Sequence, residues 1–208
     1  MYRCILLDID GTIIDTEKAV ICSLQKLLKK HKNREYSSDE LSFALGIPGV
    51  ISLHKLEIQD VETASQEWNE YLKYYAHYIL IFPQIEDTLK DLAALKIQLG
   101  IVTSKTRVEL LNDFYPFGLH LYFNHIICAD DTLKHKPDPE PILKFLDVSN
   151  VRPSETIYIG DTNYDSLCAH AAGVDFALAL WGTKDPLINA KIKLNAPGEI
   201  LQIINTFQ

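Results

Sequence analysis

The sequence predicts an α/β fold: a doubly wound parallel sheet that carries an inserted, smaller all-helical domain. From residue 82 onward, short apolar stretches of strand type alternate with helical patterns, which is typical of a parallel sheet covered by helices on both faces. A further strand-like stretch, residues 4–10, stands near the start of the chain, and residues 16–81 between them have helical patterns only. We therefore expect residues 1–15 and 82–208 to form the α/β core and residues 16–81 to form the helical domain.

The first strand-like stretch ends in two acids, Asp8 and Asp10, before the chain breaks at Gly11. Residues two apart in an extended strand point to the same face, so the two carboxylates would emerge side by side. Carboxylates that close repel each other, and one stays protonated unless they share a cation. Because Mg²⁺ prefers oxygen ligands, the stretch favours a metal site over a plain surface turn.

The segment 16–81 is expected to contain three helices. Residues 16–32 place apolar side chains on one side and end in a basic patch, which suits a helix C-terminus. The residues Ser37–Glu40 carry an N-cap signal that opens a second, short helix, and residues 46–49 are expected to be a loop. Residues 61–80 predict a third helix, whose many aromatic side chains we expect to form packing surface rather than a cofactor site.

Beyond residue 82, helices and strands are expected in turn. The helices are predicted over residues 85–95, 106–115, 139–146, 163–172 and 197–207, and the strands over residues 97–102, 125–129, 156–159 and 174–180. Ligands of doubly wound sheets bind beyond the carboxyl ends of the strands. Polar residues that directly follow the predicted strands are therefore the candidate site.

Three more polar clusters lie at or near such strand ends. Thr103 and Ser104 follow one strand, and a hydroxyl with free backbone N–H groups at the start of a helix suits a phosphoryl group. Lys136 could balance carboxylate and phosphate charge, while Asp161 and Asp165 supply further carboxylates for a cation. Each has an ordinary explanation alone, as a helix cap or a solvated charge. Together they indicate phosphoryl transfer, with a nucleophile, a charge clamp and a metal.

These clusters resemble the four motifs of the haloacid dehalogenase-like hydrolases. DIDGTIID matches the family's first motif, DxDGTxxD, and GIVTSK, HKPDPEP and IGDTNYD follow in the family's order. The resemblance implies a Rossmann-like core with a helical cap domain at residues 16–81. It also implies that Asp8 is the nucleophile that takes the phosphoryl group, and that Asp10 is the general acid and then the general base.

The same resemblance assigns the other site residues. It implies that the transferring phosphoryl group is bound by Thr103, Ser104 and Lys136. It implies that Mg²⁺ is held by Asp8, Asp161 and the main-chain carbonyl of Asp10, with Asp165 supporting or ligating it.

Three functions are compatible with these residues. The acid at position 10 points to hydrolysis of a phosphate ester or anhydride, and residues 130–141 are similar to the phosphoglycolate phosphatase and pyrophosphatase branch of the family. The leading hypothesis is therefore a Mg²⁺-dependent phosphatase of a small phosphorylated metabolite. The alternatives are a β-phosphoglucomutase-like sugar phosphomutase and a non-catalytic protein that binds a phosphorylated metabolite.

The cap stretch 46–55 weakens the mutase alternative. The related mutases usually hold the distal phosphate with an arginine and a lysine in this stretch, whereas here it offers only His54 and Lys55 as bases. We nominate these two residues for substrate specificity. A non-catalytic binder, in turn, has no need of both Asp8 and Asp10.

Composition limits the partners and the compartment. The net charge of −8 argues against a nucleic-acid partner, and no apolar run is long enough to cross a bilayer. The four cysteines lie far apart without metal-type spacing, so we interpret them as small buried hydrophobes in a reducing, cytoplasmic compartment. The sequence leaves the substrate and the oligomeric state open.

Overall fold

A six-stranded parallel sheet forms the centre of the larger part of the molecule, in a computed structural model that describes residues 2–205. Its strands are β1 (Cys4–Leu7), β4 (Gln98–Val102), β5 (His125–Ile127), β6 (Thr156–Gly160), β7 (Asp175–Ala179) and β8 (Ile192–Leu194), in the order β5-β4-β1-β6-β7-β8. The chain first steps from β1 outward to β4 and β5, and then crosses to the other side for β6, β7 and β8. The predicted doubly wound fold is confirmed, and β1 lies where the strand order reverses.

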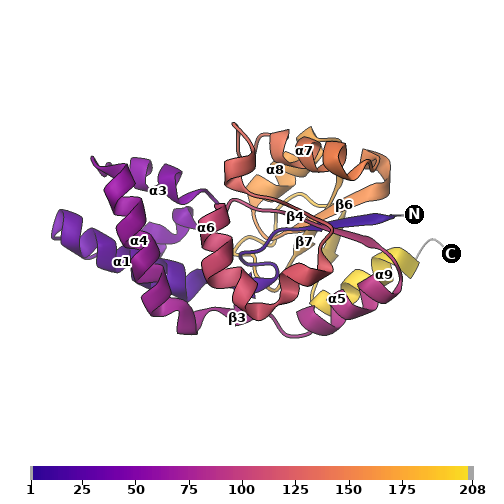
Figure 1. Ribbon diagram of the computed structural model, residues 1–208, viewed down its shortest axis with the longest axis horizontal. Coiled ribbons are helices and arrows are strands. Elements are labelled where there is room, and N and C mark those ends of the chain that lie inside the picture. Colours follow the sequence, from indigo (N-terminus) through magenta and orange to yellow (C-terminus); the bar gives the residue numbers. More distant parts are fainter. Residues whose placement is uncertain (1, 206–208) are drawn as a thin grey trace.

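Both faces of the sheet are apolar, which is why the strands show no polar alternation. Alternate side chains of β1 serve opposite faces: Ile5 and Leu7 join one buried cluster, while Cys4 and Leu6 join another. The first face is covered by α5 (Ile85–Ala94) and α9 (Ile200–Asn205), and the second by α7 (Glu140–Ser149) and α8 (Asn163–Ala171) (Figure 1). The carboxyl ends of the strands remain open for a site.

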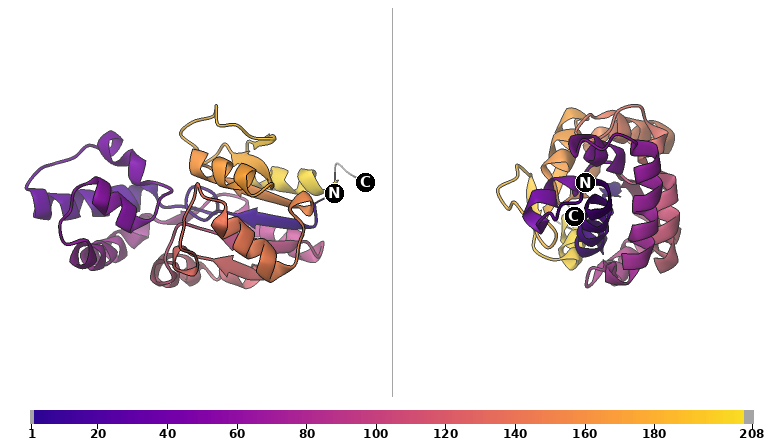
Figure 2. Two further views of the ribbon diagram at one scale, coloured as in Figure 1. Left: turned by 90° about the horizontal axis from the view of Figure 1, so that it is seen from above. Right: turned by 90° about the vertical axis from the view of Figure 1, so that its left-hand side faces the viewer.

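The helices formed by residues 17–75 gather at one end of this core, as Figures 1 and 2 show. They are α1 (Glu17–Lys32), α2 (Ser38–Leu41), α3 (Gly49–Lys55) and α4 (Val61–Tyr75), and we call residues 16–79 the helical insertion. It has a buried apolar cluster of its own, in which Trp68 packs against side chains of α1 and donates from Nε1 to Ser23 Oγ at 2.8 Å. Trp68 is thus packing surface, as expected, whereas Tyr74 is 66% exposed.

Two connections join the helical insertion to the core, and they pair with each other. Strand β2 (Ile14–Asp15) runs antiparallel to β3 (Leu80–Ile81). The predicted helix over residues 61–80 therefore ends at Tyr75 and passes through a 3₁₀ turn, because its last residues pair with a distant strand instead. The domain boundaries at 15/16 and 81/82 stay a prediction.

Other differences from the sequence prediction concern local structure. Helix α3 was not predicted, and it begins at Gly49, the last residue of the expected loop. The expected helix over residues 106–115 is a single α-turn, α6 (Arg107–Glu109), followed by a π-helical turn, Leu110–Phe114. Strand β8 was not predicted. The last helix is a 3₁₀ turn, Pro197–Glu199, followed by α9, and residues 206 and 207 of its predicted range lie outside the described residues. Among residues 2–205, no helix is long and apolar enough to span a membrane.

Candidate active site

The end of β1 places Asp8 in the centre of the sheet's open edge. Its backbone N–H donates to the carbonyl of Ile159 at 2.9 Å, which extends the pairing of β1 with β6 by one residue. The chain then turns at Gly11, whose φ is +74° and where a Cβ atom would lie 2.2 Å from Asp161 Oδ2. Only glycine can adopt this backbone and pass so close to that carboxylate without strain.

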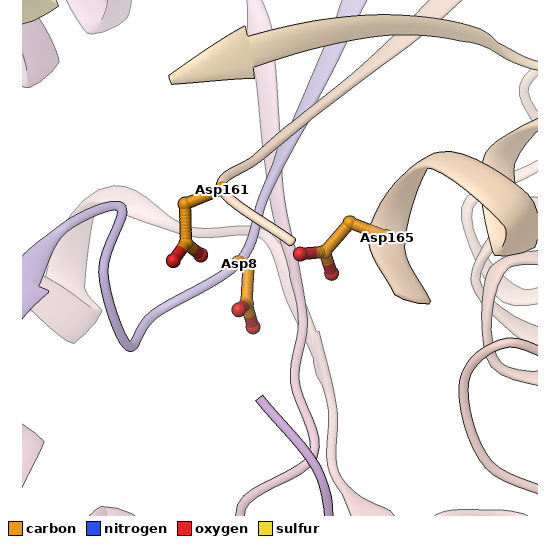
Figure 3. A group of neighbouring side chains, drawn as sticks. All are labelled: Asp8, Asp161 and Asp165. Atoms are coloured by element: carbon orange, nitrogen blue, oxygen red, sulfur yellow. The ribbon is translucent and has the colours of Figure 1, made fainter. Parts of the chain in front are cut away.

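Three aspartates meet at this edge: Asp8 from β1, Asp161 directly after β6, and Asp165 from the first turn of α8 (Figure 3). One carboxylate oxygen of each lies within 4.8 Å of the others. Burial, together with the neighbouring carboxylates of Asp165 and Asp10, raises the pKa of Asp8 to about 7 even though Lys136 opposes the shift. Burial likewise raises the pKa of Asp161 well above its usual range. Carboxylates that disfavour their own charge in this way fit a bound cation.

Lys136 supplies a positive charge beneath this acidic triad. Its Nζ lies 3.0 Å from Asp8 Oδ1 and donates to Asp165 Oδ1 at 2.7 Å, with only 1% of the side chain exposed. Burial alone lowers the pKa of this ammonium, but the charges of Asp165 and Asp8 outweigh it and raise the pKa. The contact with Asp8 is an ion pair without hydrogen-bond geometry, so Asp8 Oδ1 has no hydrogen-bond partner among the described residues.

Asp165 has both carboxylate oxygens engaged. Besides Lys136, the hydroxyl of Tyr158 lies 2.9 Å from Oδ1, and Oδ2 accepts hydrogen bonds from Thr162 N at 3.0 Å and Thr162 Oγ1 at 2.5 Å. The bonds with Thr162 cap α8, and the bond from Lys136 holds that ammonium in place. Of the two roles that the sequence left open for Asp165, this arrangement favours support of Lys136 over direct ligation of a metal.

Asp10 lies in a second cluster that the sequence analysis missed. Its Oδ1 accepts a hydrogen bond from Thr16 Oγ1 at 2.6 Å and lies 3.0 Å from Lys105 Nζ. Lys105 also donates to Asp113 Oδ2 at 2.7 Å, and both of those side chains are 8% exposed. In the sequence, this cluster could have been found only from Lys105, a charged residue directly after Thr103 and Ser104. Its partner Asp113 stands eight positions further along.

The two hydroxyl residues after β4 have different surroundings. Thr103 is buried, and its Oγ1 accepts from the backbone N–H of Lys105 at 3.2 Å. Ser104 Oγ instead donates to the carbonyl of Gly46 in the helical insertion at 3.1 Å. Gly46 has a φ of +80°, and a Cβ there would lie 2.7 Å from Thr162 Cγ2, so this loop crosses the core closely.

Among the described residues, two of the cavities between the helical insertion and the core reach the aspartates of the site. The inner cavity, of about 50 Å³, is lined by Asp8, Asp10, Ser104, Lys105 and residues of the insertion. The outer cavity, of about 350 Å³, reaches Asp10, Asp161 and the loop after β7, including Trp181 and Lys184. Lys184 Nζ lies 2.6 Å from Glu17 Oε2 across this cavity. The outer cavity has room for a small metabolite.

The structure does not place His54 and Lys55 in this site. Helix α3 buries Ser52 and Leu53 against the insertion, which turns His54 and Lys55 outward, where both are exposed. Lys55 Nζ lies 5.6 Å from the centroid of the Phe43 ring. Neither base lines the two cavities described above, whereas Gly46 does, so a role of His54 and Lys55 in substrate specificity stays a prediction.

Comparisons with known proteins agree with this geometry. The profile of the family described as "Haloacid dehalogenase-like hydrolase" matches residues 5–179. A pyrophosphatase PpaX from Oceanobacillus iheyensis is 30% identical over 184 residues, which cover 88% of this chain and 86% of that protein. A phosphoglycolate phosphatase from Aquifex aeolicus is 30% identical over 98% of this chain and 97% of that one. The crystal structure of a hydrolase from Pseudomonas syringae covers 100% of this chain and 99% of that one with a TM-score of 0.87; its identity of 21% makes this a likeness of fold.

Proposed function

The chain belongs to the haloacid dehalogenase-like hydrolase family and is a phosphatase, and from this premise we propose that it hydrolyses a small phosphorylated metabolite with Mg²⁺ through an aspartyl-phosphate intermediate. The observation that carries the proposal is the state of Asp8. This carboxylate is buried, pairs with Lys136, and keeps an oxygen without a hydrogen-bond partner among the described residues. Such a group is poised to bind a cation and attack a phosphorus atom.

The donor set fits a hard divalent cation. Asp8, Asp161 and the main-chain carbonyl of Asp10 would hold Mg²⁺, with Asp165 in the supporting position described above. When bound, Mg²⁺ neutralises negative charge on the phosphoryl oxygens. Lys136, Thr103 and the backbone N–H groups after β4 would orient the same phosphoryl group.

In the first half of the proposed reaction, an Asp8 carboxylate oxygen attacks phosphorus, and the bond from phosphorus to the leaving oxygen breaks. Asp10 begins protonated and gives its proton to that leaving oxygen. In the second half, Asp10 takes a proton from water, whose oxygen attacks phosphorus and displaces the Asp8 carboxylate. Phosphate leaves, and both aspartates return to their starting states.

We propose a substrate in which a second anionic group accompanies the phosphate, such as phosphoglycolate or pyrophosphate. The relatives that support this choice are those named above. The outer cavity adjoins Asp161, and Lys184, which pairs with Glu17 at 2.6 Å, would supply a cation for such a second anionic group.

The test is phosphate release from a panel of phosphorylated metabolites and pyrophosphate, with wild type, Asp8→Asn and Asp147→Asn compared in Mg²⁺. Asp147 is an exposed aspartate of α7 and serves as the matched control. We expect release by wild type and by Asp147→Asn, and none by Asp8→Asn. If no protein releases phosphate, the panel is examined for rearranged sugar phosphates, and a rearrangement would replace the phosphatase by the mutase.

A further inference from the structure

The second cluster, Asp10–Lys105–Asp113, is built around a buried lysine that the proposed reaction does not use. Lys105 leaves the loop after β4 and places its ammonium between two carboxylates, 3.0 Å from Asp10 Oδ1 and 2.7 Å from Asp113 Oδ2. Burying such an ammonium is costly unless it is paired. Lys105 is therefore held in place rather than left as a solvated charge.

The hydrogen bond from Thr16 and the ion pair with Lys105 use the same oxygen of Asp10. Thr16 Oγ1 and Lys105 Nζ approach Oδ1, whereas Oδ2 makes no hydrogen bond or ion pair with any described residue. The Asp10 side chain is 23% exposed and lines both cavities between insertion and core. One oxygen is thus anchored, and the other is available to a molecule in the cavity.

Resting on the proposed function, we propose that Lys105 is a positioning residue for Asp10. The ammonium fixes Oδ1 so that Oδ2 presents its proton to the leaving oxygen, and Asp113 fixes the ammonium. As the bond from phosphorus to the leaving oxygen breaks, the proton moves from Asp10 Oδ2 to that oxygen. Lys105 keeps all its protons throughout and stabilises the carboxylate that Asp10 becomes.

A role in proton donation can be separated from a role in binding phosphate by changing the leaving group. The oxygen of an alkyl phosphate such as phosphoglycolate needs a proton as it leaves, whereas p-nitrophenolate leaves readily without one. The value of kcat/KM reports the first phosphoryl transfer, so it isolates the acid step from the later attack of water. A residue that binds the phosphate itself affects both substrates equally.

The experiment measures kcat/KM for phosphoglycolate and p-nitrophenyl phosphate in four Mg²⁺-loaded variants and wild type. We expect Lys105→Met to lower kcat/KM about 30-fold for the alkyl ester and less than about threefold for the aryl ester. Asp113→Asn should show the same selectivity at about fivefold, and Lys105→Arg should restore most of the activity. Lys90→Met is the matched control, because Lys90 pairs with Glu86 at 2.9 Å on the exposed surface of α5.

The outcomes are distinguishable. An equal loss on both substrates, or no loss in Lys105→Met, overturns the positioning role while leaving the phosphatase intact. A wild type that hydrolyses pyrophosphate but neither ester keeps the proposed function and overturns this inference, because proton donation to an ester oxygen is then no part of the reaction. A wild type that is inactive on the whole panel overturns both. If thermal melting shows that Lys105→Met does not fold, Asp113→Asn provides the test. A loss of kcat/KM for the alkyl ester alone supports the positioning role, and an equal loss for both esters, or none, overturns it.

Discussion

Two lysines serve the two aspartates that follow β1, and their surroundings differ. Lys136 pairs with Asp8, which follows β1, and with Asp165 of α8, and all three side chains are buried in the core. Lys105 pairs with Asp10 and Asp113 in a loop and a π-helical turn. In each cluster one acid belongs to the proposed chemistry and the other holds the lysine.

The difference lies in what completes each cluster. The cluster of Lys136 is completed by core residues, with Tyr158 OH accepting from Nζ at 3.1 Å. The cluster of Lys105 is completed by Thr16, the first residue of the helical insertion, and Asp113 Oδ1 has no hydrogen-bond partner among residues 2–205. The core alone therefore places Asp8, whereas the core and the insertion together place Asp10.

The largest expected effect is on stability when either lysine is removed. Lys136→Met leaves two buried carboxylates without their cation and should lower the free energy of unfolding by about 3–5 kcal/mol. Lys105→Met should cost about 2 kcal/mol, because Asp10 is partly exposed and keeps its bond from Thr16. Urea denaturation at neutral pH without divalent ions measures both, with Lys90→Met as control. Equal costs would abolish the energetic distinction between the clusters.

The stability of the protein should depend on pH through the buried acids of both clusters, and more strongly through Asp8 than through Asp113. The folded-state pKa values of Asp8, about 7, and Asp113, about 6, lie above those of an unfolded chain, so the folded state binds these protons more tightly. Their contribution to stability is complete below about pH 4 and is lost as the pH rises through the folded-state values, on the order of 4 kcal/mol for Asp8.

Denaturation across that window, with a chelator present, tests this sign. Asp8→Asn should remove part of the decline in the free energy of unfolding, because Asp161, whose pKa is also raised, still contributes. Asp113→Asn should remove a smaller part that ends nearer pH 6. A wild type whose stability does not fall between about pH 4 and pH 7 would contradict the burial argument.

A divalent cation should stabilise the protein through the acidic triad beside Lys136 and not through the cluster of Lys105. At a few tens of times its Kd, Mg²⁺ should stabilise wild type by about 2 kcal/mol, a rise in Tm of roughly 4–8 °C. Asp161→Asn should abolish this rise, whereas Asp113→Asn should keep it, because Asp113 lies outside the acidic triad. Thermal melting with and without Mg²⁺ is the measurement. A rise lost in Asp113→Asn would place the cation elsewhere.

The smallest expected effect is that of Ser104→Ala, which touches neither lysine. The loss of one neutral hydrogen bond to Gly46 should lower the free energy of unfolding by about 1 kcal/mol and kcat/KM by less than about fivefold. A loss of kcat/KM beyond about tenfold would instead show that the Ser104 hydroxyl binds the phosphoryl group, as the sequence implies.

The cluster of Lys136 could be anticipated from the sequence, and the cluster of Lys105 could not. Asp8, Lys136 and Asp165 each stand in a recognisable motif at or near a strand end, and the order of strands brings them together. Asp113 stands in no motif, and its approach to Lys105 depends on a π-helical turn that residue patterns do not specify.

Weak local signals explain the other differences. Strands β2 and β3 have two residues each and form by pairing with each other. Neither can therefore be recognised from its own residues in the sequence. Strand β8, with three residues, depends in the same way on β7. For His54 and Lys55, composition identified bases in the right stretch, but the buried face of α3 decided their direction.

The pairing of β2 with β3 has a consequence for how this architecture can change. Ile14 is paired with Ile81, and Asp15 with Leu80, so the chain leaves the core and returns to it at neighbouring positions. Two antiparallel neighbours can be joined by a turn as short as about two residues. The core therefore makes no demand on the length of what lies between them. The segment that helps to place Asp10 can be lengthened, shortened or exchanged while β1 and β4 keep their positions, as is common where a domain is inserted at adjacent chain ends.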